Sequence, residues 1–304
     1  MMRDAALAAP LPGGRLHLRH GPIDIVAGAF GTPRAVETAY AAAAERLPAI
    51  LAELCAELTL LRAEARSRGP APEGHVARRM ARAVAPYAER AFITPMAAVA
   101  GAVAQEVLLA MTGSAPLARA YANNGGDIAF HLAPGERFAI GMVDRPDRPS
   151  LFGALTVEAA EPVRGAATSG WRGRSVSLGI ACAVTVLART AAEADAAATV
   201  IANAVDLPGH PAVARRAANE IAPDSDLGAL LVTRGVGPLR VDEIDTALEA
   251  GACVARSLLG QGLVNAAALH LQGRTLVVGS PRARDARRGP RAAEPRRLEA
   301  HAHV

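Results

Sequence analysis

The chain has 304 residues and a mass of 31.2 kDa, enough for a core that buries about three quarters of the surface of the unfolded chain. All 33 cationic side chains are arginine, because the sequence contains no lysine. This excludes Schiff-base chemistry, a P-loop lysine and a lysine general base. Aromatic residues make up only 3%, so we do not expect nucleic-acid bases to stack on aromatic side chains.

The net charge of +4 comes from the C-terminal tail. Residues 279–304 contain seven arginines and three acids, which leaves 26 arginines against 26 acids in the rest of the chain. A tail rich in arginine, proline and alanine without apolar periodicity is typical of a disordered segment. We therefore expect no nucleic-acid partner, although binding of the tail to an acidic surface stays open.

The cysteines Cys55, Cys182 and Cys253 lie far apart and form no CxxC motif. This predicts neither a disulfide framework nor a thiolate zinc site and fits a reducing cytoplasm. The longest uncharged apolar runs, near 92–104 and 176–188, are about 13 residues long, shorter than the roughly 20 residues of a membrane span. We expect a soluble, cytoplasmic protein without a signal peptide or a membrane partner; homo-oligomerisation stays open.

The first part of the chain predicts a hairpin followed by helices. Alternating apolar and polar residues over 15–30 indicate two strands. Helical spacing follows over 33–66, where Pro48 is expected to kink or divide the helix. A second helix is predicted over 74–90, and a third begins at Thr94, whose hydroxyl is expected to cap it. The second helix carries arginines on a predicted solvent face: Arg78, Arg79 and Arg82.

Beyond residue 113, short apolar runs separated by Gly, Pro, Asn and Asp predict a mostly antiparallel sheet. Thr190 and Glu193 form a predicted capping box that opens a helix ending near 205. The remaining predicted elements are helices near 211–220 and 241–258, a strand over 229–233 and a closing hairpin over 264–278. The fold class is therefore α+β, a mostly antiparallel sheet with packed helices in a single folded unit.

We divide the chain into three parts: a disordered N-terminus over 1–14, a folded domain over 15–278 and the arginine-rich tail over 279–304. No fixed-period repeat and no internal linker divide the domain.

Three short motifs combine polar groups with glycine or alanine. Asn123-Asn124-Gly125-Gly126-Asp127 follows an apolar strand, and its glycines allow close approach of a ligand; a tight turn explains the same residues. The second motif is Thr168-Ser169-Gly170-Trp171-Arg172-Gly173. Its hydroxyls and backbone amides, with Arg172 or Arg174, could bind a phosphate. Alternatively, the segment connects two strands and places Trp171 in the core. Asp195 and Thr199 share one helix face, which suits Mg²⁺, although these two residues taken alone are better explained by a local hydrogen bond on an ordinary helix.

Cys182 is expected to be a small buried residue, and the isolated histidines receive no role: His131, His210, His270, His301 and His303.

The order of these motifs resembles a known family. Together with Phe92-Ile-Thr-Pro-Met-Ala-Ala-Val-Ala-Gly101, they make the chain, over about 15–278, similar to a prokaryotic family without an assigned activity. That family is itself similar to ApbE, the flavin transferase formerly called a thiamine biosynthesis lipoprotein; the similarity to ApbE itself covers about 92–205. The resemblance implies an ApbE-like fold that binds FAD or FMN with Mg²⁺, and FMN transfer to a threonine or serine hydroxyl.

Carried over to this sequence, the resemblance assigns the flavin site to Thr94, Asn124, Gly125, Gly126, Asp127, Thr168, Ser169 and Gly170. It assigns the metal to Asp195 and Thr199. ApbE enzymes also have a lysine near the position of 97–105 and a histidine and an aspartate where this chain has 177–182; this chain has none of them. The expected function is therefore binding of a flavin or related nucleotide with a divalent metal, extending to FMN-transfer-like chemistry. The alternative is a non-catalytic binding or structural protein that keeps the fold.

Overall fold

A nine-stranded sheet forms the centre of the computed structural model, which describes residues 5–66, 69–143, 151–173 and 176–279. Every neighbouring pair of its strands is antiparallel. The strands, in spatial order, are β1 (Leu7–Leu11), β2 (Arg15–His20), β3 (Ile23–Phe30), β4 (Arg119–Asn124), β5 (Asp127–Leu132), β8 (Gly165–Ser169), β9 (Ala183–Ala188), β12 (Ala266–Leu271) and β13 (Arg274–Gly279). The predicted α+β class is confirmed.

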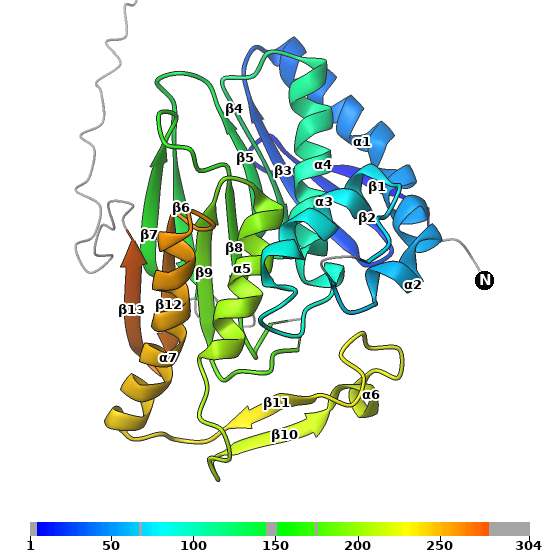
Figure 1. Cartoon of the computed structure of the whole chain (residues 1–304). Helices are drawn as coiled ribbons and strands as arrows, with labels where there is room; N and C mark the ends of the chain where they lie inside the picture. Colours follow the sequence, from blue (N-terminus) through cyan, green and yellow to red (C-terminus); the bar gives the residue numbers. More distant parts are fainter. Residues whose placement is uncertain (1–4, 67–68, 144–150, 174–175, 280–304) are drawn as a thin grey trace, which may run out of the picture.

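Four long helices cover one face of this sheet, each over a successive part of it (Figure 1). Helix α1 (Pro33–Ala56) packs on β2 and β3, and α4 (Val99–Ser114) packs on β4 and β5. Helix α5 (Ala191–Ala204) packs on β8 and β9, and α7 (Val241–Gly260) packs on β12 and β13. The main core lies between this helical layer and the sheet.

The N-terminal part differs from the prediction in two places. Strand β1 lies inside the segment 1–14 that was expected to be disordered, and it pairs with β2 over its whole length. Helix α1 runs through Pro48 but ends at Ala56, because Glu57 leaves the helical conformation, and a separate turn, α2 (Leu58–Leu61), follows. The predicted disorder of the tail lies outside the described residues, apart from Gly279 at the end of β13.

The predicted second helix divides at Pro86 into α3 (His75–Val84) and the short η1 (Ala85–Tyr87). The third begins as a 3-10 turn, η2 (Pro95–Ala98), and continues as α4. Thr94 occupies the N-cap position without capping, because its hydroxyl donates to Asp226 instead.

Residues 95–114 have the length and composition to cross a membrane, with a mean hydropathy of 1.5, and are longer than the uncharged apolar run near 92–104. In this fold the segment contributes a core helix: 44% of it is buried, and α4 packs against α1, α5 and the sheet. A core helix of a soluble protein meets the same criteria, so this segment is weak evidence for a membrane span.

Two glycines hold the beginning of α5 against its neighbours. A Cβ atom at Gly101 of α4 would lie 2.3 Å from the carbonyl oxygen of Ala191, and one at Gly165 of β8 would lie 2.2 Å from the amide nitrogen of Ala191. Only glycine permits these approaches. Helix α5 is itself rich in buried alanine, so the polar residues of its second and third turns lie close to α4 and β8.

Two hairpins leave the main sheet. The first, β6 (Arg137–Val143) with β7 (Leu151–Glu158), connects β5 to β8 and packs over a second apolar cluster. Phe138 makes edge contacts there with the rings of Phe30, Tyr121 and Phe130. This hairpin therefore covers part of the sheet on the side away from the helices.

The second hairpin corrects the helix predicted near 211–220. Residues Val213–Ala217 form β10, which pairs with β11 (Leu231–Val236), and only Ala218–Ile221 form a helical turn, α6. Alanine and arginine favour helix locally, but pairing with a distant strand overrides this preference.

Candidate functional site

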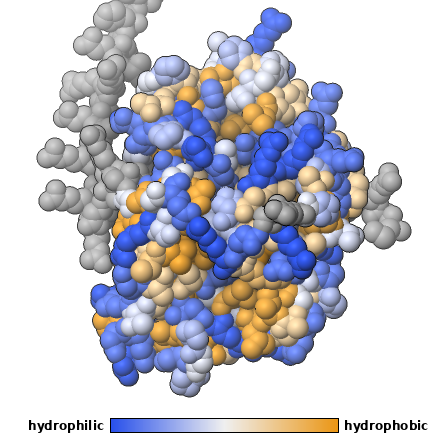
Figure 2. Space-filling view, in the orientation of Figure 1, coloured by the Kyte–Doolittle hydropathy of each residue, from blue (hydrophilic) through white to orange (hydrophobic). Residues whose placement is uncertain are grey.

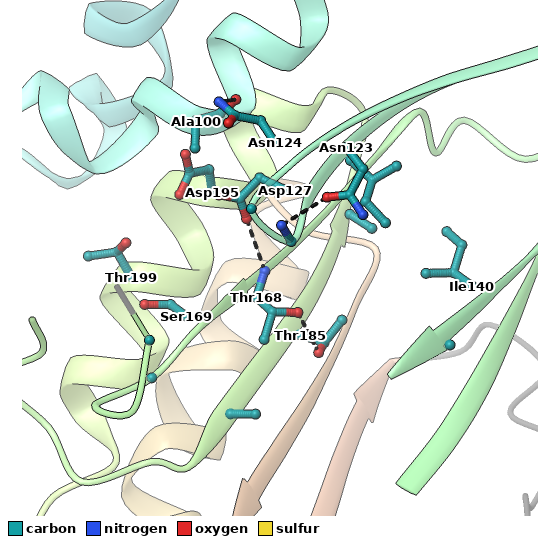
Figure 3. Close-up of a pocket in the computed structure, with 18 of the residues that line it drawn as sticks. Ala100, Asn123, Asn124, Asp127, Ile140, Thr168, Ser169, Thr185, Asp195 and Thr199 are labelled. Atoms are coloured by element: carbon teal, nitrogen blue, oxygen red, sulfur yellow. Dashed lines mark hydrogen bonds between the residues drawn. The ribbon is translucent and has the colours of Figure 1, made fainter. Parts of the chain in front are cut away.

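A cavity of about 420 Å³ opens where four strands of the sheet, the first turn of α4 and one face of α5 meet (Figure 3). Its volume lies within the range of about 300–1,000 Å³ typical of small-molecule sites. The predicted site residues that line it are Asn124, Gly125, Gly126, Asp127, Thr168, Ser169, Gly170, Asp195 and Thr199. The structure thus brings together all the predicted residues except Thr94.

The turn between β4 and β5 forms one wall. Gly125 and Gly126 have φ angles of 68° and 115°, which favour glycine, and the Gly126 amide donates to Asn123 Oδ1 at 2.8 Å. Asn124 is buried; its Nδ2 donates to the carbonyl oxygen of Ala100 at 3.2 Å. Asn124 therefore connects this turn to the N-terminus of α4. The same residues form a tight turn and line the cavity, so the two interpretations of this motif are compatible.

Asp127 connects this turn to the Thr168-Ser169-Gly170 loop. Its Oδ1 accepts a hydrogen bond from the Thr168 amide at 3.2 Å, and the Thr168 hydroxyl is paired with that of Thr185 at 2.9 Å. The Ser169 hydroxyl has no hydrogen-bond partner among the described residues and lies at the cavity (Figure 3). Ser169 is therefore the hydroxyl of this loop that is available to a ligand.

Gly170 follows at a close approach. A Cβ atom there would lie 2.5 Å from the carbonyl oxygen of Cys182. The loop can therefore reach the cavity only with glycine at this position, which explains the last residue of the motif.

Asp195 projects from the second turn of α5 towards the first turn of α4. Its Oδ2 accepts a hydrogen bond from the Gly101 amide at 2.9 Å. Burial raises the pKa of Asp195 well above its usual value, the negative charge of Asp127 raises it further, and the amides of Gly101 and Ala100 oppose both effects. No positively charged group pairs with Asp195 among the described residues.

Thr199 lies one turn further along α5 and also lines the cavity. Figure 3 shows it on the same side as Asp195 and Ser169. Its hydroxyl forms no hydrogen bond within the described part of the chain, so the local Asp195–Thr199 bond considered from the sequence is not formed. The two side chains are free of each other and both face the cavity.

The donor set fits a hard divalent cation. The cavity offers the carboxylates of Asp127 and Asp195 and the hydroxyls of Thr199 and Ser169, all oxygen ligands of the kind that Mg²⁺ prefers. The described residues contain no group of three or more His, Cys, Asp or Glu side chains that could hold a metal ion by themselves. A cation here would therefore complete its shell with ligand oxygens and water, as Mg²⁺ usually does beside phosphates.

Part of the lining was not predicted from the sequence. Cys182 and Thr185 of the β8–β9 region and Ile140 of β6 line the cavity. Ile140 reaches it because the β6–β7 hairpin folds back over the sheet, which no local pattern predicts. Thr94 is buried and lies outside this lining, bonded to Asp226.

The other side chains that the sequence analysis considered also lie outside the lining. Trp171 stacks with the guanidinium of Arg172, 4.4 Å from the ring centroid. His131, His210 and His270 do not line the cavity, and His210 is paired with Glu243 at 3.2 Å. Arg174, His301 and His303 are outside the described residues.

A family model described as AbpE bacteria matches residues 8–277. The chain belongs to this family. The predicted resemblance is therefore confirmed, over a range that also includes β1.

Curated relatives of this AbpE family member include UPF0280 proteins of archaea. The protein of Methanopyrus kandleri is 42% identical over 134 residues, which cover 44% of this chain and 49% of the relative. The protein of Methanothermobacter thermautotrophicus is 34% identical over 133 residues, again 44% of this chain and 49% of the relative. The chain thus spans about half the length of the curated relatives it matches.

Solved structures with a similar arrangement include two flavin transferases. The Pseudomonas stutzeri flavinyl transferase ApbE, in its apo form, is 11% identical, with a TM-score of 0.37; the match covers 91% of this chain and 94% of that one. The flavin transferase ApbE of Vibrio cholerae is 11% identical, with a TM-score of 0.34 and coverage of 91% and 96%. Likeness at this level says nothing about the activity of the AbpE family member described here.

Proposed function

We propose that the cavity binds a flavin nucleotide, FAD or FMN, or a related nucleotide, together with a divalent cation such as Mg²⁺. The observation that carries this proposal is the convergence of Asp127, Asp195 and Thr199 with two glycine-containing loops around one cavity. Oxygen donors for a hard cation beside loops that a phosphate can approach closely are the two requirements of a nucleotide–metal site.

Each part of the lining has a role in this proposal. Asp127, Asp195 and Thr199 hold the cation, which neutralises phosphate oxygens when it is bound. The Ser169 hydroxyl and the backbone at Gly125 and Gly126 meet the phosphates. The apolar side chain of Ile140 contacts the ring system or ribose from the β6–β7 side.

Family membership adds support of a general kind. The motifs that resemble ApbE are the ones that line this cavity, and ApbE enzymes use FAD and Mg²⁺. The free cysteines fit a reducing cytoplasm, which is where we expect the protein to act on a soluble nucleotide.

FMN transfer is the reaction that this site would catalyse if it is active. An acceptor hydroxyl would bond to the phosphorus on the flavin side of FAD, the diphosphate bond would break, and AMP would leave. The hydroxyl proton needs an acceptor, and the two carboxylates of the described lining, Asp127 and Asp195, are already assigned to the cation. The absence of lysine from the chain and of histidine from this lining favours the rival function, nucleotide binding without transfer.

Calorimetry tests the binding. We expect FAD to bind the full chain in the presence of Mg²⁺ and to bind at least about tenfold more weakly in EDTA. Asp195→Asn should lose the Mg²⁺ dependence, because an amide does not supply the charge that the cation needs. Asp245→Asn is the matched control, since this exposed carboxylate pairs with Arg274 away from the cavity. Absence of binding by FAD, FMN and ADP at millimolar concentration, with or without Mg²⁺, would overturn the proposal.

AMP release separates the two functions. An active transferase should release AMP from FAD in the presence of Mg²⁺, slowly to water and faster to an acceptor hydroxyl. Binding without any AMP over many hours assigns the non-catalytic function.

A further inference from the structure

A second cavity, of about 550 Å³, lies between α3, α4 and the beginning of α5. In Figure 2, which shows the face carrying these helices, hydrophilic residues gather over α3. Side chains from one face of α3, at positions i, i+3, i+4 and i+7, line it: His75, Arg78, Arg79 and Arg82. The sequence predicted a plain solvent face for these arginines, whereas the structure places them around a cavity.

Two of the three guanidinium groups have no negative partner among the described residues. Arg79 is neutralised by Glu106 at 3.0 Å. Arg78 is half-buried, and its Nη2 contacts only His75 Nδ1, at 3.1 Å. Arg82 forms no ion pair within the described residues. Arg78 is a partly desolvated cation without a counter-charge, which is unfavourable, and Arg82 places a second, exposed positive charge at the same cavity, so the two favour an anionic ligand.

The opposite wall presents acceptors. Gln105 Oε1 of α4 and Glu193 Oε2 of α5 are buried, belong to residues that line the cavity, and accept no hydrogen bond from the described part of the chain. Buried acceptors of this kind require donors. Water or a ligand can supply these donors; a fully ionised phosphate or carboxylate has none to give, so a ligand that fills this wall in place of water carries O–H or N–H groups in addition to its negative charge.

We propose that this cavity binds a phosphomonoester that carries several hydroxyl groups, the chemistry of a sugar phosphate. The phosphate pairs with Arg78 and Arg82, beside the N-terminus of α5, where Thr190 and Ala192 also line the cavity. The hydroxyl groups donate to Gln105 Oε1 and Glu193 Oε2. This site is separate from the nucleotide cavity, shares no lining residue with it and requires no metal.

Ribose 5-phosphate is the probe for this proposal. In calorimetry of the full chain in EDTA, we expect it to bind more tightly than inorganic phosphate or ribose alone. Arg78→Gln and Arg82→Gln should each weaken binding by about tenfold or more, because each removes a charge-assisted contact. Arg19→Gln is the matched control: it removes the same charge from an exposed position on β2.

Three results would overturn the proposal. They are absence of ribose 5-phosphate binding at millimolar concentration, unchanged affinity in Arg82→Gln, and equal affinity for inorganic phosphate. Arg82 is exposed, so its replacement is expected to leave the fold intact. Asp195→Asn should leave this affinity unchanged, which distinguishes failure here from failure of the proposed nucleotide site.

Discussion

Asp195 of α5 accepts a hydrogen bond from the backbone amide of Gly101, 2.9 Å away in the first turn of α4. The amides of a first helical turn have no partner within the helix, so this carboxylate caps α4 from another element. It also faces the cavity of about 420 Å³. One side chain therefore belongs to the helical packing and to the candidate site, and its replacement must be judged on both.

The stability of the metal-free protein should fall as the pH rises because of Asp195. Burial and the charge of Asp127 raise the pKa of its carboxyl above 3.8, so the folded protein holds a proton that the unfolded chain releases. From about pH 4 up to the folded-state pKa, the unfolding free energy therefore decreases with pH. Asp195→Asn removes this contribution while its amide oxygen still accepts from Gly101.

Melting curves in EDTA across this pH range check the effect. The Tm of Asp195→Asn should increase relative to that of the natural sequence as the pH rises. Addition of Mg²⁺ should raise the Tm of the natural sequence only. Parallel pH profiles for the two proteins would show that Asp195 keeps an ordinary pKa in the fold.

The contact between α4 and α5 should depend on Gly101. A Cβ atom there would lie 2.3 Å from the Ala191 carbonyl oxygen, so Gly101→Ala must push the helices apart and should cost about 1–3 kcal/mol. Gly113→Ala, in the same helix, meets nothing within 4 Å and should stabilise by about 0.5–1 kcal/mol. Urea denaturation of both variants measures the difference, and equal effects would mean that the close approach is absent in solution.

A charge cluster between α1, α3 and α4 should contribute stability that acid removes. Burial raises the pKa of Glu106, but hydrogen bonds and charges from Arg79 and Arg46 outweigh it, so its pKa is lowered. Glu106→Gln should therefore cost about 2 kcal/mol at neutral pH.

The loss should shrink as the pH falls through the folded-state pKa, because the natural carboxyl is then protonated as well. Glu45→Gln, at an exposed position of α1 without an ion pair to any described residue, is the control and should stay within about 0.5 kcal/mol of the natural sequence. A constant deficit for Glu106→Gln down to strong acid would contradict the ionic origin of its contribution.

Local chemistry predicted much of the fold. Four features depend only on neighbouring residues, and the structure has all of them: the Gln272-Gly273 turn, the Gly125-Gly126 turn, the Thr190 cap and the break before α3. The candidate site was predicted through motif resemblance, because Asp195 and the Gly125-Gly126 turn are about 70 residues apart and no periodicity relates them.

What the sequence could not supply is non-local. Residues Val213–Ala217 form a strand only because β11 pairs with them. Ile140 reaches the cavity only because its hairpin folds back over the sheet. Arg78 and Arg82 line a cavity only because α4 and α5 pack beside α3. Each case depends on a partner far along the chain, which helix or strand propensity does not encode.

Thr94 shows most clearly how a distant contact changes a prediction made from the sequence. Its hydroxyl was expected to bind a ligand but is bonded to a residue 132 positions away. It is 2% exposed and donates to Asp226. Thr94→Val preserves the shape but leaves the carboxylate without this donor, so it should cost about 1–3 kcal/mol of unfolding free energy. Affinity for FAD with Mg²⁺ should stay unchanged, since Thr94 does not line the cavity. Asp226→Asn, whose amide oxygen can still accept, should lose less stability. Denaturation and calorimetry of both variants decide the assignment: weaker FAD binding by Thr94→Val at unchanged stability would return Thr94 to the site.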